Sequence, residues 1–234
     1  ELMRLLIDVE GLGVDYAWKL TKAVFNYTNH TVMPEALEKW RIELIGKLLP
    51  RHVEIVGMIN HMFLEEVKAK WGDGEWICDM SIFGNAEGGE CIRMGNLSVI
   101  GAHHVNGVAY MHTEIVKRDT FTNLYKWSLE TGEPGKFVNC TNGVTPRRWI
   151  HCANPALSKL ITKKLGSDAW LKDLALIRGI CKFKDEPEFQ REWTEVKDNA
   201  KLHMAKWVSK HCNLEIDTSF LIDVQVKRIH EYKR

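Results

Sequence analysis

The sequence predicts an α/β protein in which helices alternate with a few buried strands. Apolar residues recur at helical spacing through most of the first third and again near 186–210. A short apolar run at 97–100 and an alternating run at 220–227 are typical of buried strands. The stretch 128–137, rich in Gly and Pro, is the clearest candidate for a boundary between two domains.

The first half of the chain carries four predicted helices. Residues 14–25 place their apolar side chains on one stripe, and residues 50–71 repeat that pattern over a longer span. The segment 31–40 predicts a further helix, because Pro34 stands near its start and good helix formers follow. Helical spacing returns at 108–118 after the predicted strand.

The second half carries two more predicted helices and a final strand. Asn154 before Pro155 predicts the start of a helix, and Gly166 predicts its end. A long charged helix follows at 186–210. Its predicted apolar stripe consists of Phe189, Trp193, Val196, Ala200, Met204 and Trp207. The alternating run at 220–227 then predicts a mostly buried strand.

Composition limits the classes of function. The chain has 234 residues, 45% hydrophobic and 27% charged, with a net charge of +1. These values indicate a folded protein and argue against nucleic-acid binding through bulk charge. No apolar run approaches the roughly 18 residues of a membrane span.

Cysteine and histidine spacing also limits the chemistry. The six cysteines show no CxxC pair, which predicts reduced thiols in an intracellular protein. His103, His104 and His112 lack an acidic or Cys partner at ligand spacing, so no metal site is predicted. The chain does not begin with Met, and we expect both of its ends to be cut.

The strongest candidate for chemistry is the basic end of the chain. Lys227, Arg228, Lys233 and Arg234 stand against Glu231 alone, directly after the predicted strand. Ligands of open α/β sheets bind at the carboxyl ends of strands. Cationic groups stabilise the charge that develops in phosphoryl transfer, and an Arg binds two phosphate oxygens as a fork. From spacing alone, a solvated and charged helix start is the competing interpretation.

Three weaker candidates follow from local context. Arg147 and Arg148 lie beside a predicted helix start that could bind an anion, or they are ordinary surface charge. Asn142 lies in a predicted tight turn, where it is structural or hydrogen-bonds a hydroxyl. His30 precedes Pro34, where it is part of a helix cap or projects toward a ligand. No two carboxylates can be placed as glycoside hydrolysis requires.

Six longer sequence motifs occur in the chain in this order: NYTNHTVMPEALEKW, LLPRHVEI, GAHHVNGVAYMHTEIVK, NGVTPRRW, ANPALSKLI and DVQVKRIHEYKR. Over its whole length the chain closely resembles the α-glucan (glycogen or starch) phosphorylases, in which these motifs occur. The resemblance implies the GT-B architecture of two Rossmann-like domains. Residues 1–138 would then end the N-terminal glucan or substrate domain, and residues 139–234 would begin the C-terminal cofactor domain.

The resemblance also implies an activity. Members of this family are retaining glycosyltransferases that cleave terminal α-1,4-linked glucose from glycogen, starch or maltodextrin with inorganic phosphate. The product is glucose 1-phosphate, and the cofactor is pyridoxal 5′-phosphate, whose phosphate serves as the acid. This explains why no carboxylate pair is needed. The expected protein is a cytoplasmic, allosteric homodimer that binds glucan and phosphate, without nucleic acid or membrane as partners.

Four positions in the basic end match the phosphate sites of the family. By resemblance, Lys227 and Lys233 would hold the cofactor phosphate, with Tyr232 against the same site. Arg228 would hold the substrate phosphate. Two adjacent phosphates repel each other strongly, so they can share a site only among several cations.

Two further positions match the sugar site. By resemblance, His30 would contact the glucose 6-hydroxyl and the reacting sugar, and Asn142 would also contact the bound glucose. The expected catalytic set is therefore His30, Arg228 and Lys233. The expected substrate-binding set is His30, Asn142 and Arg228.

The resemblance covers about a quarter to a third of a family member. The chain is expected to be an internal fragment that ends before the Schiff-base lysine and is inactive alone. Two alternatives stay open. One is a glucan-binding remnant of the same fold that has lost its chemistry, and the other is a nucleotide-sugar glycosyltransferase, which would need no cofactor-phosphate cluster.

Overall fold

The computed structural model describes residues 1–226 and residue 229. Its contacts divide the chain into a first unit, Glu1–Asn142, and a second unit that begins at Gly143. The predicted boundary between residues 138 and 139 lies inside strand β6 (Phe137–Asn139), which belongs to the sheet of the first unit. The assignment of the two stretches to the two domains of a GT-B fold stays a prediction.

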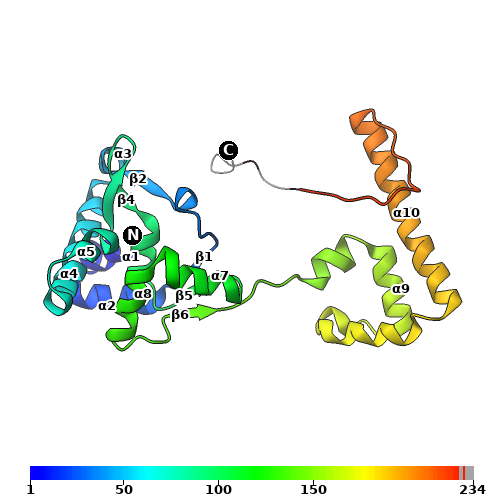
Figure 1. Ribbon diagram of the computed structural model, residues 1–234, viewed down its shortest axis with the longest axis horizontal. Helices are drawn as coiled ribbons and strands as arrows, with labels where there is room; N and C mark the ends of the chain where they lie inside the picture. Colours follow the sequence, from blue (N-terminus) through cyan, green and yellow to red (C-terminus); the bar gives the residue numbers. More distant parts are fainter. Residues whose placement is uncertain (227–228, 230–234) are drawn as a thin grey trace. The chain divides into compact units, whose positions relative to one another are not determined.

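A parallel sheet forms the part of the first unit that matters for function. It consists of β1 (Tyr27–Asn29), β5 (Val105–Gly107) and β6, in the order β1-β5-β6 (Figure 1). The strands pair in direct register, so that Tyr27 lies beside Val105 and Val105 beside Phe137. All the connections between these strands contain helices, as parallel pairing requires.

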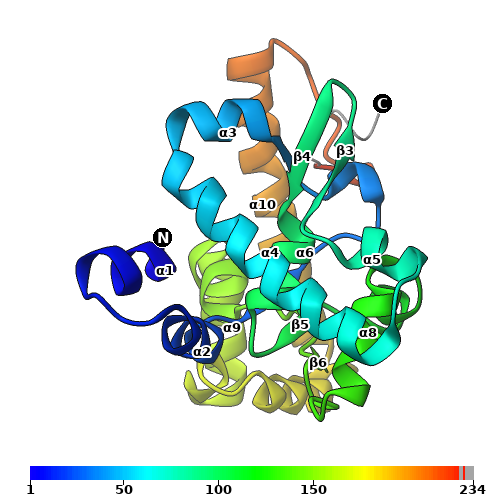
Figure 2. The same ribbon diagram turned by 90° about the vertical axis from the view of Figure 1, so that its left-hand side faces the viewer.

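The first unit also contains an antiparallel sheet. Its strands are β2 (Lys39–Arg41), β3 (Phe83–Ala86) and β4 (Gly89–Arg93), in the order β2-β4-β3. The hairpin of β3 and β4 stands beside helix α3 (Figure 2). The two sheets and their helices confirm the α/β class predicted from the sequence.

The prediction of a helix at 31–40 is wrong. Only one 3-10 turn forms, at η2 (Pro34–Ala36), and the residues that follow pair with β4 as strand β2. Trp40 lies opposite Ile92 in this pairing. A long-range strand partner thus outweighs the local helix propensity of the segment, which sequence spacing could not reveal.

The helical segments of the first unit surround the two sheets. They are α1 (Leu2–Arg4), η1 (Leu5–Val9), α2 (Val14–Val24), α3 (Ile42–Leu48), α4 (Pro50–Trp71), α5 (Glu75–Met80), α6 (Met94–Gly101), α7 (Tyr110–Ile115), η3 (Val116–Thr120) and α8 (Thr122–Glu130). The predicted helices at 14–25 and 50–71 are confirmed. Ile59, Phe63 and Val67 of α4 are buried and form one face of the core.

The predicted strand at 97–100 is wrong, because these residues lie in helix α6. Val99 and Ile100 are buried within the core of the first unit. The side chain of Asn96 anchors the helix by donating to the carbonyls of Asp79 and Ser81, at 2.8 and 2.9 Å. A short apolar run is compatible with a buried helix or a buried strand, so its pattern alone could not decide.

The helix predicted at 108–118 is confirmed as α7 and η3. Thr113 and Val116 are buried, whereas Met111 is 74% exposed. The buried Thr113 faces β5 very closely. A Cβ atom added to Gly107 would lie 2.0 Å from Thr113 Oγ1 and 2.8 Å from Thr113 Cα. Only glycine therefore fits at the end of β5.

Helical segments make up the regular structure described for the second unit. They are η4 (Arg147–Cys152), α9 (Pro155–Leu165), η5 (Ala169–Leu171), η6 (Leu174–Phe183) and α10 (Pro187–Cys212). Asn154 caps α9 as predicted, because its Oδ1 accepts from the Leu157 N–H at 3.1 Å. Gly166 ends the helix in the left-handed conformation, with φ at 71°.

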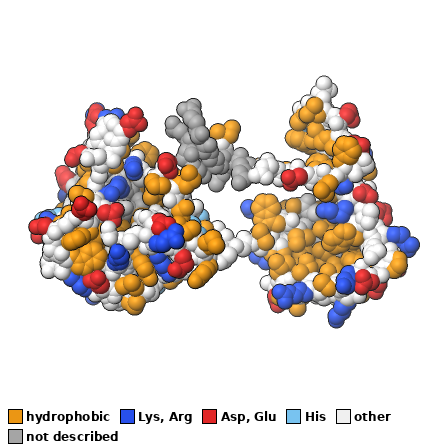
Figure 3. Space-filling view, viewed as in Figure 1, with side chains coloured by type: hydrophobic (Ala, Val, Ile, Leu, Met, Phe, Trp, Pro, Cys, Tyr) orange, Lys and Arg blue, Asp and Glu red, His pale blue; other side chains and the backbone are white. Residues whose placement is uncertain are grey.

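The long predicted helix is confirmed as α10, but little of its apolar stripe is buried. Phe189 is buried, whereas Trp193 and Trp207 are exposed. Figure 3 shows hydrophobic side chains gathered on one face of this unit. The buried hydrophobic residues described from Gly143 onward are Leu160, Ile161, Trp170 and Phe189.

The predicted strand at 220–227 is wrong for the described residues. Residues 220–226 form no strand, and Leu221 is 96% exposed and Val226 85% exposed. A strand needs a hydrogen-bonding neighbour, and the described part of the second unit contains no other strand. Alternating side chains alone therefore do not fix this conformation.

None of the helices described in the structure combines the length and the apolar character that crossing a membrane requires.

Replacing Asn154 with Ala should lower the free energy of unfolding of α9 by about 1 kcal/mol, because the cap acceptor is lost. Asn154→Asp is the matched control, since it keeps an oxygen at the same place. Hydrogen exchange of the α9 amides measures both changes. A loss as large in the Asp variant as in the Ala variant would show that the acceptor is not what stabilises the helix.

Replacing Gly107 with Ala should destabilise the first unit by about 1–3 kcal/mol, because the added methyl group meets the backbone of Thr113. Gly57→Ala is the control. Gly57 lies within α4 with open space around its Cα, so that variant should gain about 0.5–1 kcal/mol. Urea unfolding of both variants tests the difference, and equal effects would contradict the close approach described above.

Candidate functional site

The three parallel strands end at one level. Asn29, Gly107 and Asn139 are partners in the register, and each is the last residue of its strand. The residues that follow therefore leave the sheet at the same edge. Neighbouring strands lie about 4.8 Å apart, so the chains leaving β1 and β6 are about 10 Å apart. The carboxyl edge of a parallel sheet is where ligands bind in open α/β folds.

His30 is the first residue after β1, and its side chain is exposed. The turn around it is closed by Asn29, whose Oδ1 accepts from the Thr31 N–H at 3.0 Å. Thr31 Oγ1 in turn accepts from the Met33 N–H at 3.1 Å. These side chains bond to the backbone two residues further on, which fixes the loop without a helix. The interpretation of His30 as part of a helix cap is therefore wrong.

Asn29 is almost completely buried and ties this turn to the sheet. Its Nδ2 donates to the hydroxyl oxygen of Tyr27 at 3.0 Å. Burial raises the pKa of Tyr27, while the hydrogen bond from Asn29 opposes that shift. The phenol is thus a neutral acceptor at physiological pH. The two residues hold the base of the loop that presents His30.

A cavity of about 250 Å³ lies beside His30. The strand β1, the loop after it and the start of α6 line this cavity. Glu38 and Ser98 supply polar groups to its wall, and Gly95 leaves room at the helix start. Asn142 is not among its lining residues.

Asn142 follows β6 at the same edge of the sheet, and its side chain is exposed. Its backbone N–H donates to the Val108 carbonyl at 2.9 Å. The Cys140 N–H donates to Asn106 Oδ1 at 2.7 Å and to the Gly107 carbonyl at 3.3 Å. The end of β5 thus fixes the segment that carries Asn142. The structure brings His30 and Asn142 to one sheet edge, although no single cavity described here is lined by both.

Several supporting residues escaped the sequence analysis. Asn29, Asn106 and Asn139 lie at or next to the ends of the three strands. Asn29 and Asn106 bond to the segments that follow β1 and β6, and Asn139 bonds to α7 and to the end of β5. Asn139 Nδ2 donates to Thr113 Oγ1 at 3.1 Å and to the Gly107 carbonyl at 3.3 Å. Asn is rare within strands and common in turns, so its repetition after short apolar runs was the available signal.

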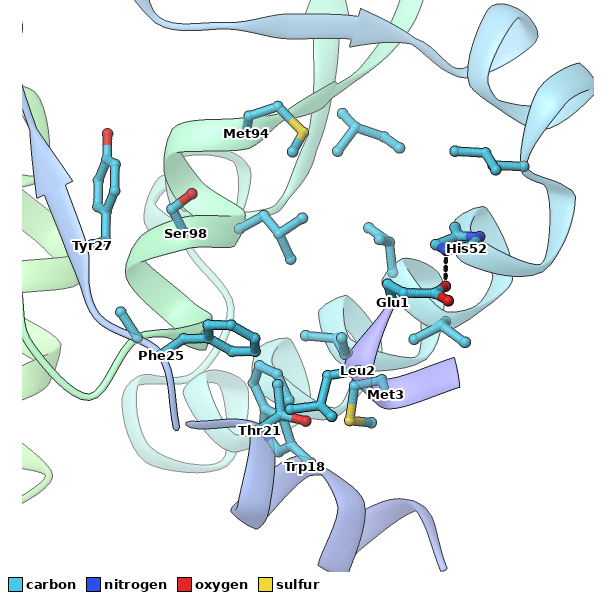
Figure 4. A pocket seen from close by; sticks show the side chains of 18 of the residues that line it. Glu1, Leu2, Met3, Trp18, Thr21, Phe25, Tyr27, His52, Met94 and Ser98 are labelled. Carbon is cyan, nitrogen blue, oxygen red and sulfur yellow. Dashed lines mark hydrogen bonds and ion pairs between the residues drawn. The ribbon is translucent and has the colours of Figure 1, made fainter. Parts of the chain in front are cut away.

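A second, apolar cavity of about 560 Å³ lies between α1, α2, α4 and α6 (Figure 4). At its edge, Glu1 Oε2 and His52 Nε2 are joined by a hydrogen bond of 2.7 Å. Hydrogen bonds from Arg4 and His52 lower the pKa of Glu1 to about 2. Tyr27 and Ser98 line both this cavity and the smaller one beside His30. Neither His30 nor Asn142 lines this cavity.

The remaining predicted residues divide into two groups. Lys227, Arg228, Tyr232 and Lys233 lie outside the described residues. Arg147 donates to the Leu171 carbonyl at 2.8 Å, so it has a structural role in the second unit, whereas Arg148 is exposed. Within residues 1–226 and at residue 229, no group of three or more His, Cys, Asp or Glu side chains could hold a metal ion.

Comparison with known proteins identifies the relatives of this chain. The model of the carbohydrate phosphorylase family matches residues 1–234. The chain is 48% identical to glycogen phosphorylase 2 of Dictyostelium discoideum over 236 aligned residues, covering all of this chain and 23% of that protein. It is 46% identical to the cytosolic alpha-glucan phosphorylase 2 of Arabidopsis thaliana and 44% identical to the liver form of glycogen phosphorylase of Bos taurus. All of this chain and 27% of each of those two relatives are covered.

The chain spans about a quarter of the length of these curated relatives. The family match covers every residue of it, which confirms the resemblance seen in the sequence and its coverage of an internal part of a longer family member. On these grounds, the chain belongs to the carbohydrate phosphorylase family.

Proposed function

We propose that the protein containing this chain is an α-glucan phosphorylase of GT-B architecture. It transfers the terminal α-1,4-linked glucose of a glucan to inorganic phosphate with retention, and it yields glucose 1-phosphate. The observation that carries the proposal is the family match over the whole chain, together with the position of His30 and Asn142 at one edge of a parallel sheet. Sugar-contacting residues at such an edge fit the general placement of ligands in α/β folds.

His30 and Asn142 serve as the sugar-binding groups in this proposal. His30 hydrogen-bonds the glucose 6-hydroxyl, and Asn142 hydrogen-bonds the same glucose. Each stands in a loop that buried or backbone groups hold in place, which reduces the entropy lost on binding. Asn29 and Val108 provide that support.

The basic end supplies the phosphate-binding groups. Lys227 and Lys233 hold the phosphate of pyridoxal 5′-phosphate, with Tyr232 against it, and Arg228 holds the substrate phosphate. The donor set fits the cofactor, because two ammonium groups and a phenol are suited to a phosphate anion. When bound, the cofactor supplies an acid at its phosphate. Arg228 orients the substrate phosphate through two parallel hydrogen bonds, which a Lys at this position could not form.

We further propose that the 234-residue chain alone releases no glucose 1-phosphate, because it spans only about a quarter of its relatives. The complete protein is a homodimer under allosteric control and is cytosolic, as the name of the Arabidopsis relative says of that protein. Its partners are glucan and inorganic phosphate. Nucleic acid and membranes are not partners.

Replacing His30 or Asn142 with Ala in the complete protein should lower kcat/KM for glucan phosphorolysis by about tenfold to a hundredfold, the effect of one hydrogen bond left unmade. His61→Ala is the control, because His61 is an exposed histidine of α4 away from the sheet edge. Glucose 1-phosphate release measures the activity. A protein that binds glucan but releases none, even without substitutions, would support the glucan-binding remnant instead.

Replacing Arg228 with Lys should raise KM for phosphate by about tenfold or more while KM for glucan stays within about twofold, since the charge remains and the fork is lost. Initial rates at varied phosphate and glucan concentrations separate the two constants. Equal changes in both would place Arg228 outside the phosphate site.

A further inference from the structure

His112 lies on α7 and accepts a hydrogen bond from the end of β5. The Val108 N–H donates to His112 Nδ1 at 3.2 Å. A ring nitrogen that accepts a hydrogen bond carries no proton, so His112 takes part in this contact through a bare Nδ1. His112 Nε2 is buried and bonds to no group in residues 1–226 or residue 229. Within those residues, the bond from Val108 is the contact that orients the ring.

Val108 bonds to both His112 and Asn142. Val108 donates its N–H to His112 and accepts the Asn142 N–H at its carbonyl, at 2.9 Å. Its neighbour Gly107 accepts from the Cys140 N–H and from Asn139 Nδ2. Val108 thus connects a side chain of α7 to the loop after β6. Without the bond to His112, the Val108 peptide is free to rotate, and the Asn142 backbone bonded to its carbonyl moves with it.

The same helix supports the loop at a second point. Thr113, next to His112, is buried and accepts from Asn139 Nδ2 at 3.1 Å while donating to the Ala109 carbonyl at 2.9 Å. Thr113 bonds to Asn139, the last residue of β6. His112 orients Val108, whose carbonyl binds the Asn142 N–H. Two adjacent residues of α7 therefore hold both ends of one loop, which a helix packed for stability alone would not require.

We propose that His112 is a positioning residue for the sugar site, acting on Asn142 through Val108. The inference rests on the proposed role of Asn142 as a glucose-contacting residue. His112 touches no substrate in this proposal. It supplies one acceptor, at the position of Nδ1, and any side chain with an acceptor at that position should replace it.

Two amide variants test the geometry of this acceptor. In His112→Asn, the Oδ1 atom takes the place of Nδ1, whereas in His112→Gln the acceptor lies one bond further from the backbone. The two variants have the same chemistry and differ in where the acceptor stands. We expect His112→Asn to keep the function of His112 and His112→Gln to lose it.

Hydrogen exchange reports the link without any activity. In the 234-residue chain, the Val108 and Asn142 amides should exchange about tenfold or more faster in His112→Gln than in the wild type, and within about twofold of it in His112→Asn. The Tyr27 amide, which donates to the His104 carbonyl at 2.9 Å, is the internal control and should not change. Unchanged exchange at Val108 and Asn142 in His112→Gln would overturn the proposal.

Glucose binding in the complete protein completes the test. His112→Gln should weaken glucose affinity about tenfold, as one lost hydrogen bond does, while KM for phosphate stays unchanged. The effect should vanish in an Asn142→Ala background, since coupled residues are not additive. If Asn142→Ala alone leaves affinity unchanged, the proposed role of Asn142 fails. If Asn142→Ala weakens binding and His112→Gln does not, the positioning role of His112 is overturned.

Discussion

The direct register of the parallel sheet is the constraint on which the candidate site depends. Because Asn29, Gly107 and Asn139 end their strands at one level, the chain leaves the sheet three times at the same edge. A shift of one residue in either pairing would turn the side chains that follow to the opposite face. The close approach of Gly107 to Thr113 helps to fix this register, since it allows α7 to pack directly against the end of β5.

Polar side chains at the strand ends support the candidate site at this edge. Asn29 bonds within the loop of His30, and Asn106 bonds to the segment that leads to Asn142. Asn139 ties the end of β6 to α7. The groups that would meet a sugar are exposed, while the groups that hold them are wholly or partly buried. A ligand can thus be bound by loops that lose little freedom on binding.

The second unit differs from the first in how little it buries. The described residues from Gly143 onward bury four large or medium apolar side chains, Leu160, Ile161, Trp170 and Phe189, and leave much of α10 exposed. The alternating segment 220–226 has the residues of a strand and no strand beside it in the described part of this unit. An alternating segment such as this one forms a strand only where a second strand lies beside it.

The sequence by itself determined the α/β class, the long helices α4 and α10 and the cap at Asn154. Its six long motifs also determined the family. These features depend on periodicity, on single capping residues or on long sequence motifs, all of which are local in the chain. Only the tertiary structure decided that residues 97–100 are helical and that 39–41 pair as a strand. It alone brought His30 and Asn142 to one edge, because strand pairing joins residues far apart in the chain, and no local pattern encodes the partner.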